Sequence, residues 1–226
     1  MEAEARRRRA VAVAGHTGDA GTVRNALDDP APSVRQGALV ALARIGSLSC
    51  QELQRALGDP DAGVRRRACE VAGRLGTGNR LDVEQTADAG DVATENCDEL
   101  VAALRCCADD GSPQVCEAAC YSLGERPGRD VTTTVLVLIR VAGNHPEALC
   151  REAAIAALGS IGDPLGLEAV VAALSDKLGV RRRATVALAA FDGPVAEAAL
   201  RRAATSRDWQ TRQAAEDLLG DRRSQS

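Results

Sequence analysis

Aromatic residues are almost absent from this chain of 226 residues. Tyr121, Phe191 and Trp209 make up 1% of it, although 45% of the residues are hydrophobic. Ala, Val and Leu must therefore supply most of the buried surface, and such small side chains let helix backbones approach closely. The scarcity of rings argues against a large aromatic-lined ligand pocket and against a stacking platform for single-stranded nucleic acid. We expect thin stacked helices rather than one thick core.

An excess of either charge is also missing. The 28 basic residues, of which only Lys177 is a lysine, stand against 32 acidic ones, and the formal net charge is −4. So small a charge argues against a nucleic-acid partner. No apolar run approaches the roughly 18 residues that cross a bilayer, and the acidic start of the chain does not fit a secretory signal. We therefore expect no membrane partner and a cytoplasmic location.

The chain does contain a phrase that recurs about every 31 residues. Its clearest copy runs from Asp59-Pro60 through Val64-Arg65 to Gly76, and an earlier copy runs from Asp29 to Gly46. We call the valine position of the phrase the anchor. The anchors are Val34, Val64, Val115, Cys150, Val180 and Thr211, in steps of 30, 51, 35, 30 and 31 residues. A half copy opens the chain at residues 6–18, and the copy at Thr211 is shortened.

Each copy has a helical pattern. From the anchor Val64, apolar residues recur at the spacing of one helix face, and they are Val64, Ala68, Val71, Ala72 and Leu75. The preceding Asp-Pro ends one helix and starts the next, and the closing glycine supplies a stop. Each copy is therefore predicted to be a hairpin of a short helix A, a turn and a helix B. Such hairpins bury their faces only by stacking on neighbours.

These phrases, Asp-Pro, Val-Arg, Ala and Leu-Gly in that order, resemble HEAT repeats of the short type found in phycobilisome-lyase-like HEAT proteins. The resemblance covers nearly the whole chain. It implies an all-α fold, an α-solenoid (superhelix) of about six HEAT-like helical hairpins with an N-terminal half repeat, in which residues 1–226 form a single solenoid. The resemblance is specific for the fold and not for the function, because such repeats serve scaffolds, lyase subunits and repair enzymes.

The step of 51 residues interrupts the period. It exceeds the others by about 20 residues, so residues 77–95 are predicted to be a polar insertion between the second and third repeats, a loop or a single helical turn. Insertions of this kind decorate one face of a repeat array and are often functional. A tolerated surface insertion is the alternative.

An arginine follows the anchor in five copies. These arginines are Arg35, Arg65, Arg151, Arg181 and Arg212. A position that recurs once per repeat serves stacking, so each guanidinium is predicted to bridge the carbonyls of its own turn or an aspartate of the adjacent repeat. The functional alternative is a basic ladder that binds a ligand.

In short HEAT repeats helix B lines the concave wall, and this resemblance gives a candidate partner-binding stripe. Offsets of three, six and ten residues from the anchors define it. The predicted partner-binding positions are Val40, Arg44, Arg67, Glu70, Arg74, Tyr121, Glu125, Arg183 and Val186. The centre of the stripe is small and apolar with isolated charges, which favours a groove for a protein segment over a phosphate-binding face. If the chosen face is wrong by one step, these residues are packed instead.

All eight cysteines lie between residues 50 and 150. They are predicted to be reduced thiols. Cys69 and Cys120 fall on the packed side of helix B, where a small apolar residue is needed. The candidates for a metal or redox site are Cys106, Cys107, Cys116 and Cys120, which end one helix and begin the next. No Cys-x-x-Cys and no nearby histidine accompany them, so core filling is the alternative.

The sequence contains no evident catalytic residues. His16 and His145 are the only histidines, and neither has an evident nucleophile partner. We therefore expect a monomeric, non-catalytic scaffold or adaptor, without a cofactor, that binds another protein on its concave face. Tyr121 is the predicted anchor, because aromatic residues dominate binding hot spots. The alternatives are a bilin-lyase-like enzyme or enzyme subunit, a cysteine-based metal or redox module in the third repeat, and a DNA-repair protein.

Overall fold

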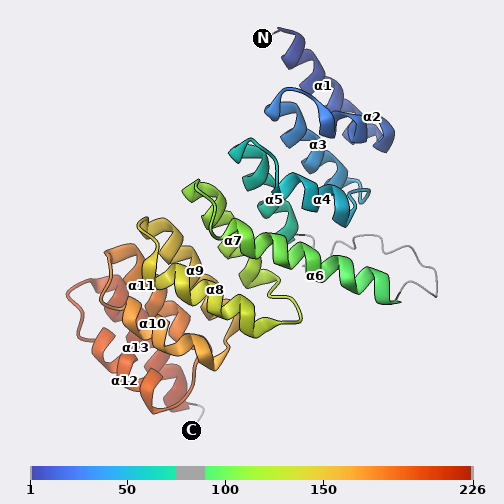
Figure 1. Cartoon of the computed structure of the whole chain (residues 1–226). Coiled ribbons are helices and arrows are strands. Elements are labelled where there is room, and N and C mark those ends of the chain that lie inside the picture. The colour runs from blue at the N-terminus through green and yellow to red at the C-terminus, as the bar shows by residue number, and fades with distance from the viewer. Residues whose placement is uncertain (1, 75–89, 225–226) are drawn as a thin grey trace. The chain divides into compact units, whose positions relative to one another are not determined.

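The computed structural model describes the backbone of residues 2–74 and 90–224, and the side chains of residues 2–74 and 98–221. This part of the chain is all α-helical and contains no strand, which confirms the predicted all-α solenoid class (Figure 1). The α-helices are α1 (Glu2–Thr17), α2 (Ala20–Asn25), α3 (Pro32–Arg44), α4 (Cys50–Leu57), α5 (Ala62–Arg74), α6 (Gly90–Cys107), α7 (Pro113–Glu125), α8 (Val131–Asn144), α9 (Ala148–Ile161), α10 (Leu167–Ala173), α11 (Leu178–Ala187), α12 (Pro194–Ala203) and α13 (Trp209–Ser224). Three short 3-10 helices, Ala26–Asp28, Pro164–Gly166 and Leu188–Ala190, extend α2, α10 and α11.

The helices pair as the repeat pattern predicts. α1 is the B helix of the opening half repeat, and six A–B hairpins follow, from α2 and α3 to α12 and α13. The last B helix, α13, is full length rather than shortened. The chain divides into two compact units, Met1–Ser122 and Leu123–Ser226. The boundary falls within α7.

The predicted insertion falls mostly outside the described residues. Residues 75–89 are not described, and residues 90–95 belong to the backbone of α6. Helix A of the third repeat therefore begins earlier than the sequence pattern indicates.

Short polar residues set the helix ends. Ser49 accepts a hydrogen bond from the Glu52 backbone N–H, and the Glu52 carboxylate accepts one from the Ser49 backbone N–H, which caps α4 reciprocally. Pro32 occupies the first turn of α3, where its missing N–H costs nothing. Gly162 follows α9 with φ of +68°, a left-handed conformation that glycine adopts freely. Gly162 thus confirms the closing glycine of the sequence pattern, whereas Pro30 and Pro60 lie before α3 and α5 and not in their first turns.

The six anchors form the centre of the packing in each repeat. Each of them is buried, including the polar residue Thr211 at the last anchor. The other buried positions are supplied mainly by Leu, Ala and Val, and Phe191 is the only buried aromatic side chain of the described residues. The core is therefore built from small and medium side chains, as the composition predicts.

Glycines at one repeat position explain why larger side chains are absent. A Cβ atom on Gly15, Gly124 or Gly159 would lie 2.7–2.8 Å from atoms of an alanine on the next B helix. These partners are Ala41, Ala157 and Ala187, and Gly73 meets Ser122 in the same manner. The B helices of successive repeats thus approach through contacts that have no room for a methyl group.

Candidate functional site

Three of the five recurring arginines, Arg35, Arg65 and Arg151, connect successive repeats, as predicted. Arg35 donates from Nε and Nη2 to the carboxylate of Asp59 in the next repeat, over 2.8 and 2.7 Å. It also donates from Nη1 to two carbonyls of its own turn. Arg65 and Arg151 repeat this arrangement with Asp110 and Asp176. Bidentate Arg–carboxylate pairs of this kind fix both distance and orientation.

Each of these aspartates also shapes its own turn. Asp59 accepts a hydrogen bond from the backbone N–H of Asp61, and Asp110 accepts one from the N–H of Ser112, each over 2.8 Å. The hydrogen bond from Arg65 lowers the pKa of Asp110, and that from Arg151 lowers the pKa of Asp176. These carboxylates therefore stay ionised while they hold a turn and the arginine of the preceding repeat.

We call the series of arginine–aspartate pairs between successive repeats the ladder, and it departs from the sequence pattern at Arg7 and Arg182. Arg7 of α1 pairs with Asp29 over 2.7 Å, so the half repeat contributes a rung. Arg212 donates to the Ser206 carbonyl of its own turn.

In the third repeat Cys116 stands in the arginine position, and its thiol donates to the Ala108 carbonyl over 3.1 Å. The fifth repeat uses Arg182 rather than Arg181, in a bidentate pair with Asp208.

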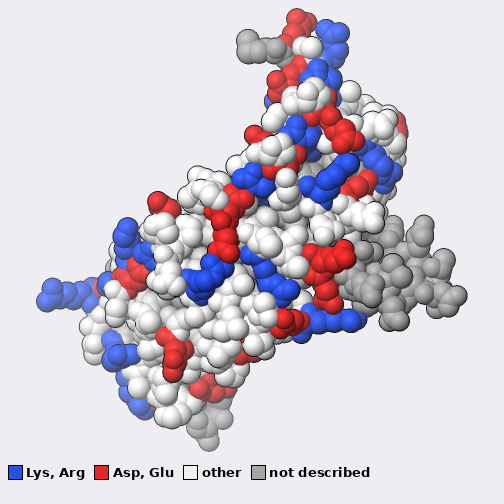
Figure 2. Space-filling view, in the orientation of Figure 1, with Lys and Arg blue, Asp and Glu red and all other residues white. Residues whose placement is uncertain are grey.

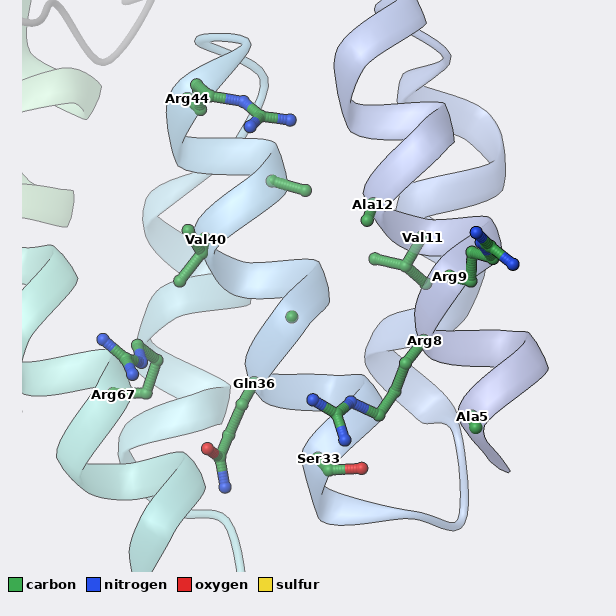
Figure 3. Close-up of a pocket in the computed structure, with 12 residues that line it drawn as sticks. Ala5, Arg8, Arg9, Val11, Ala12, Ser33, Gln36, Val40, Arg44 and Arg67 are labelled. Atoms are coloured by element: carbon green, nitrogen blue, oxygen red, sulfur yellow. The ribbon is translucent and has the colours of Figure 1, made fainter. Parts of the chain in front are cut away.

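A groove of about 590 Å³ runs along the B helices of the first unit. It is lined by residues of α1, α3 and α5 (Figure 3). Arg8 extends from α1 toward Ser33 and Gln36 near the start of α3, whereas Arg44 lies at the other end of α3 (Figure 3). Val11 and Val40 lie between these two arginines. The groove thus has an apolar middle and guanidinium groups toward its ends.

Four arginines line this groove, and none of its described lining residues is acidic. Arg67 is paired with Glu70 over 2.5 Å. Arg8, Arg9 and Arg44 have no ion-pair partner in the part of the chain that the structure describes. The Arg44 guanidinium lies against α1, because a Cβ on Gly15 would be 2.8 Å from its Nη2 atom. Three cationic groups are therefore available to a ligand in this groove.

The predicted partner-binding residues all lie at least partly at the surface. In the first unit, Val40, Arg44 and Arg67 line the groove, Glu70 holds Arg67, and Arg74 is exposed. Tyr121 is 40% exposed and does not line the groove.

In the second unit, Glu125 and Val186 are exposed, and Arg183 pairs with Glu152 over 3.5 Å. The side chains at these nine positions are therefore at least partly accessible, and their use in binding stays a prediction.

Sequence reasoning missed Arg8, Arg9, Ser33 and Gln36 of the groove. The structure supplies the register that the sequence pattern lacks here, because the Arg7–Asp29 pair places the anchor of the half repeat at Arg6. The offsets of three and six residues from Arg6 give Arg9 and Ala12, which both line the groove.

The four cysteines of the proposed metal or redox site do not gather around one point. Cys106 is exposed, whereas Cys107, Cys116 and Cys120 are buried. Of the described residues, no three of these four thiols lie within the distance that a shared metal ion requires. Cys107 instead lies beside Cys69 of α5, and this contact together with burial raises the pKa of the Cys69 thiol. The sulfur atoms of Cys69, Cys107, Cys116 and Cys120 are thus part of the packing of the third repeat.

The visible surface mixes both charges. Figure 2 shows acidic and basic side chains next to one another on this face of each unit. No helix of the described residues is long and apolar enough to cross a membrane.

The fold and the ladder define a helical-repeat protein of the solenoid class. A family model for HEAT repeats matches residues 2–72, 22–103 and 97–184. The chain therefore belongs to the HEAT-repeat family, as the resemblance implied. No protein of curated function matches the sequence significantly.

Several solved structures share the fold at low sequence identity. An engineered protein is 20% identical with a TM-score of 0.64, over 91% of this chain and 99% of that chain. A designed armadillo repeat protein in complex with the peptide (KR)4 is 17% identical with a TM-score of 0.59, over 88% and 97%. The complex of CpcE and CpcF of phycocyanin lyase from Nostoc sp. PCC7120 is 21% identical with a TM-score of 0.58, over 89% and 76%.

Proposed function

We propose that this protein is a non-catalytic scaffold that binds an acidic segment of another protein in the groove of α1, α3 and α5. The observation that carries the proposal is the set of three arginines, Arg8, Arg9 and Arg44, that have no ion-pair partner among the described residues and lie around an apolar middle, with no acidic residue in the described lining. Carboxylates are the natural partners of such guanidinium groups, and apolar side chains of the same segment would cover Val11 and Val40.

The similarity to a designed repeat protein that binds the peptide (KR)4 supports a peptide as the ligand. The charge of the groove in this chain is the reverse of what a basic peptide needs. Electrostatic complementarity contributes mainly to specificity and to the rate of association. An acidic peptide is therefore the expected ligand, and binding is expected to weaken as the salt concentration rises.

Fluorescence anisotropy with two matched peptides tests the proposal. One labelled peptide is rich in Glu and Leu, and the other carries Lys in place of each Glu. We expect the full chain to bind the acidic peptide and not the basic one. The Arg8→Gln/Arg44→Gln variant should bind about 25-fold more weakly, since each lost solvent-exposed ion pair is worth up to about 1 kcal/mol, or about fivefold. Arg201→Gln, which breaks an exposed pair with Glu197 in the other unit, is the control.

Two results would contradict the proposal. One is equal affinity for the acidic and basic peptides, and the other is unchanged affinity in the double-arginine variant. If neither peptide binds at concentrations up to about 1 mM, the groove is not a peptide site of useful strength.

Tyr121 is proposed as an additional anchor outside the groove, because its ring is a large apolar group at the surface of the same unit. The comparison of Tyr121→Ala with Tyr121→Phe tests this role. The alanine variant should lose partner capture from lysate while it stays folded, and the phenylalanine variant should retain it. Capture that is unchanged in Tyr121→Ala excludes the anchor.

A further inference from the structure

The second unit contains a pocket of about 230 Å³ at the point where the arginine–aspartate ladder is interrupted. Val171 and Leu174 of the α10 end, Arg181 of α11, and Arg202 and Ala203 of α12 contribute to its walls. Ser175, Ser206 and Thr211 complete the lining. No acidic residue is among the described residues that line it.

Ser206 occupies the ladder position that an aspartate fills in other repeats. It lies five residues before the anchor Thr211, as Asp59 lies five residues before Val64. The Ser206 hydroxyl accepts a hydrogen bond from the Asp208 backbone N–H over 3.2 Å, as Asp59 accepts one from Asp61. Ser206 thus keeps the role of the aspartate in the turn, but it has no carboxylate to offer an arginine of the preceding repeat.

Arg181 is the arginine that this substitution leaves without a carboxylate. Its Nη2 donates to the Asp176 carbonyl over 3.0 Å, but its Nε is buried and has no hydrogen-bond partner among the described residues. In Arg35, Arg65 and Arg151 the Nε atom is a donor to the ladder aspartate. A buried donor without a partner is costly, so this atom marks a place where an acceptor is missing.

The stacking role of Arg181 is carried by its neighbour. Arg182 forms the bidentate pair with Asp208, whose carboxylate also accepts from the Thr211 hydroxyl. Asp176 is likewise occupied by Arg151. Arg202 has no ion-pair partner in the described part of the chain. Two guanidinium groups therefore border the pocket while the nearby carboxylates are already bound to other arginines.

We propose that this pocket binds a small oxyanion, a phosphate or a carboxylate, that takes the place of the missing ladder aspartate. Arg181 Nε and the Arg202 guanidinium would donate to its oxygen atoms, and the Ser206 O–H is free to donate as well. The volume corresponds to about eight water molecules, which suits an anion of a few heavy atoms rather than a cofactor. This site is independent of the groove in the first unit.

Thermal unfolding of the full chain in inorganic phosphate or malonate, against sodium chloride of equal ionic strength, tests the site. Ligands that bind only the folded state raise the Tm. We expect at least one of the two anions to raise the Tm of the wild type by about 2 °C or more at millimolar concentration. The anion that gives the larger shift identifies the preferred chemistry.

Three variants locate the effect. In Ser206→Asp the restored carboxylate should occupy Arg181, raise the Tm without any anion and abolish the anion-dependent shift. Arg181→Gln should also abolish the shift, whereas Arg201→Gln, on the outer face of α12, should retain it. The proposal is overturned if neither anion shifts the wild type, or if Ser206→Asp and Arg181→Gln respond as the wild type does.

Discussion

Gly159 offers the sharpest test of how closely neighbouring repeats pack. A Cβ atom at this position in α9 would lie 2.7 Å from the Cβ and 2.9 Å from the Cα of Ala187 in α11. Neither atom can rotate away, because both are fixed to the α11 backbone, so the two helices must separate. Overpacking of this kind costs about 1–3 kcal/mol, which exceeds the gain of about 1 kcal/mol that alanine brings to a helix. We expect Gly159→Ala to lower the free energy of unfolding by about 1–2 kcal/mol.

Gly143 provides a matched control in the same unit. It lies in α8, and no atom lies within 4 Å of the position that its Cβ would take. The same substitution should here raise the free energy of unfolding by about 0.5–1 kcal/mol, because alanine restricts the unfolded chain and favours the helix. The two variants are thus expected to change the stability in opposite directions.

Equilibrium unfolding in urea, followed by far-UV circular dichroism, measures both effects. If the two units unfold in separate steps, the change belongs to the step of Leu123–Ser226, which contains both glycines. An increase in stability for Gly159→Ala equal to that for Gly143→Ala would refute the close approach of α9 and α11.

The remaining predictions concern the ladder. Arg65→Met should lower the free energy of unfolding by about 2–3 kcal/mol, because it removes a largely buried bidentate pair and two carbonyl bonds. Arg66→Met, which breaks a more exposed pair with Glu70, should cost about 0.5 kcal/mol, and equal losses in urea unfolding would contradict the ladder. The pKa values of Asp110 and Asp176 are lowered in the folded state, so their stabilisation is present above their unfolded pKa and is lost as the pH falls through the folded pKa. We expect the urea concentration at the midpoint of unfolding to decrease as the pH is lowered below about 5. This decline should be shallower in Asp110→Asn/Asp176→Asn, and an unchanged slope would exclude these carboxylates as its source.

The two sequence predictions about packing held for different reasons. The anchors were predicted correctly because every repeat must bury the same face of its B helix, so one pattern recurs through the chain. The scarcity of aromatic residues was also interpreted correctly, but the sequence did not indicate which glycines make the closest contacts. That depends on how Gly124 and Gly159 face Ala157 and Ala187 across the repeat interfaces.

The arginines show where reading one repeat at a time is insufficient. Sequence position alone predicted that Arg35, Arg65 and Arg151 would each bridge the carbonyls of a turn or an aspartate of the adjacent repeat, and in the structure each of them makes both contacts. Sequence position could not predict that Arg182 rather than Arg181 would pair with Asp208. The change of one turn residue, from an aspartate to Ser206, selects which guanidinium pairs with the next repeat.

The sequence by itself determined the repeat and its helical hairpins, since these follow from local spacing that recurs along the chain. Only the tertiary structure decided which charges are neutralised. Within the part of the chain that the structure describes, Arg8, Arg9 and Arg44 remain unpaired around the groove, and Arg181 remains without a carboxylate at its pocket. An ion pair between repeats requires two side chains from distant positions to meet in space, and the spacing within one repeat does not contain that information.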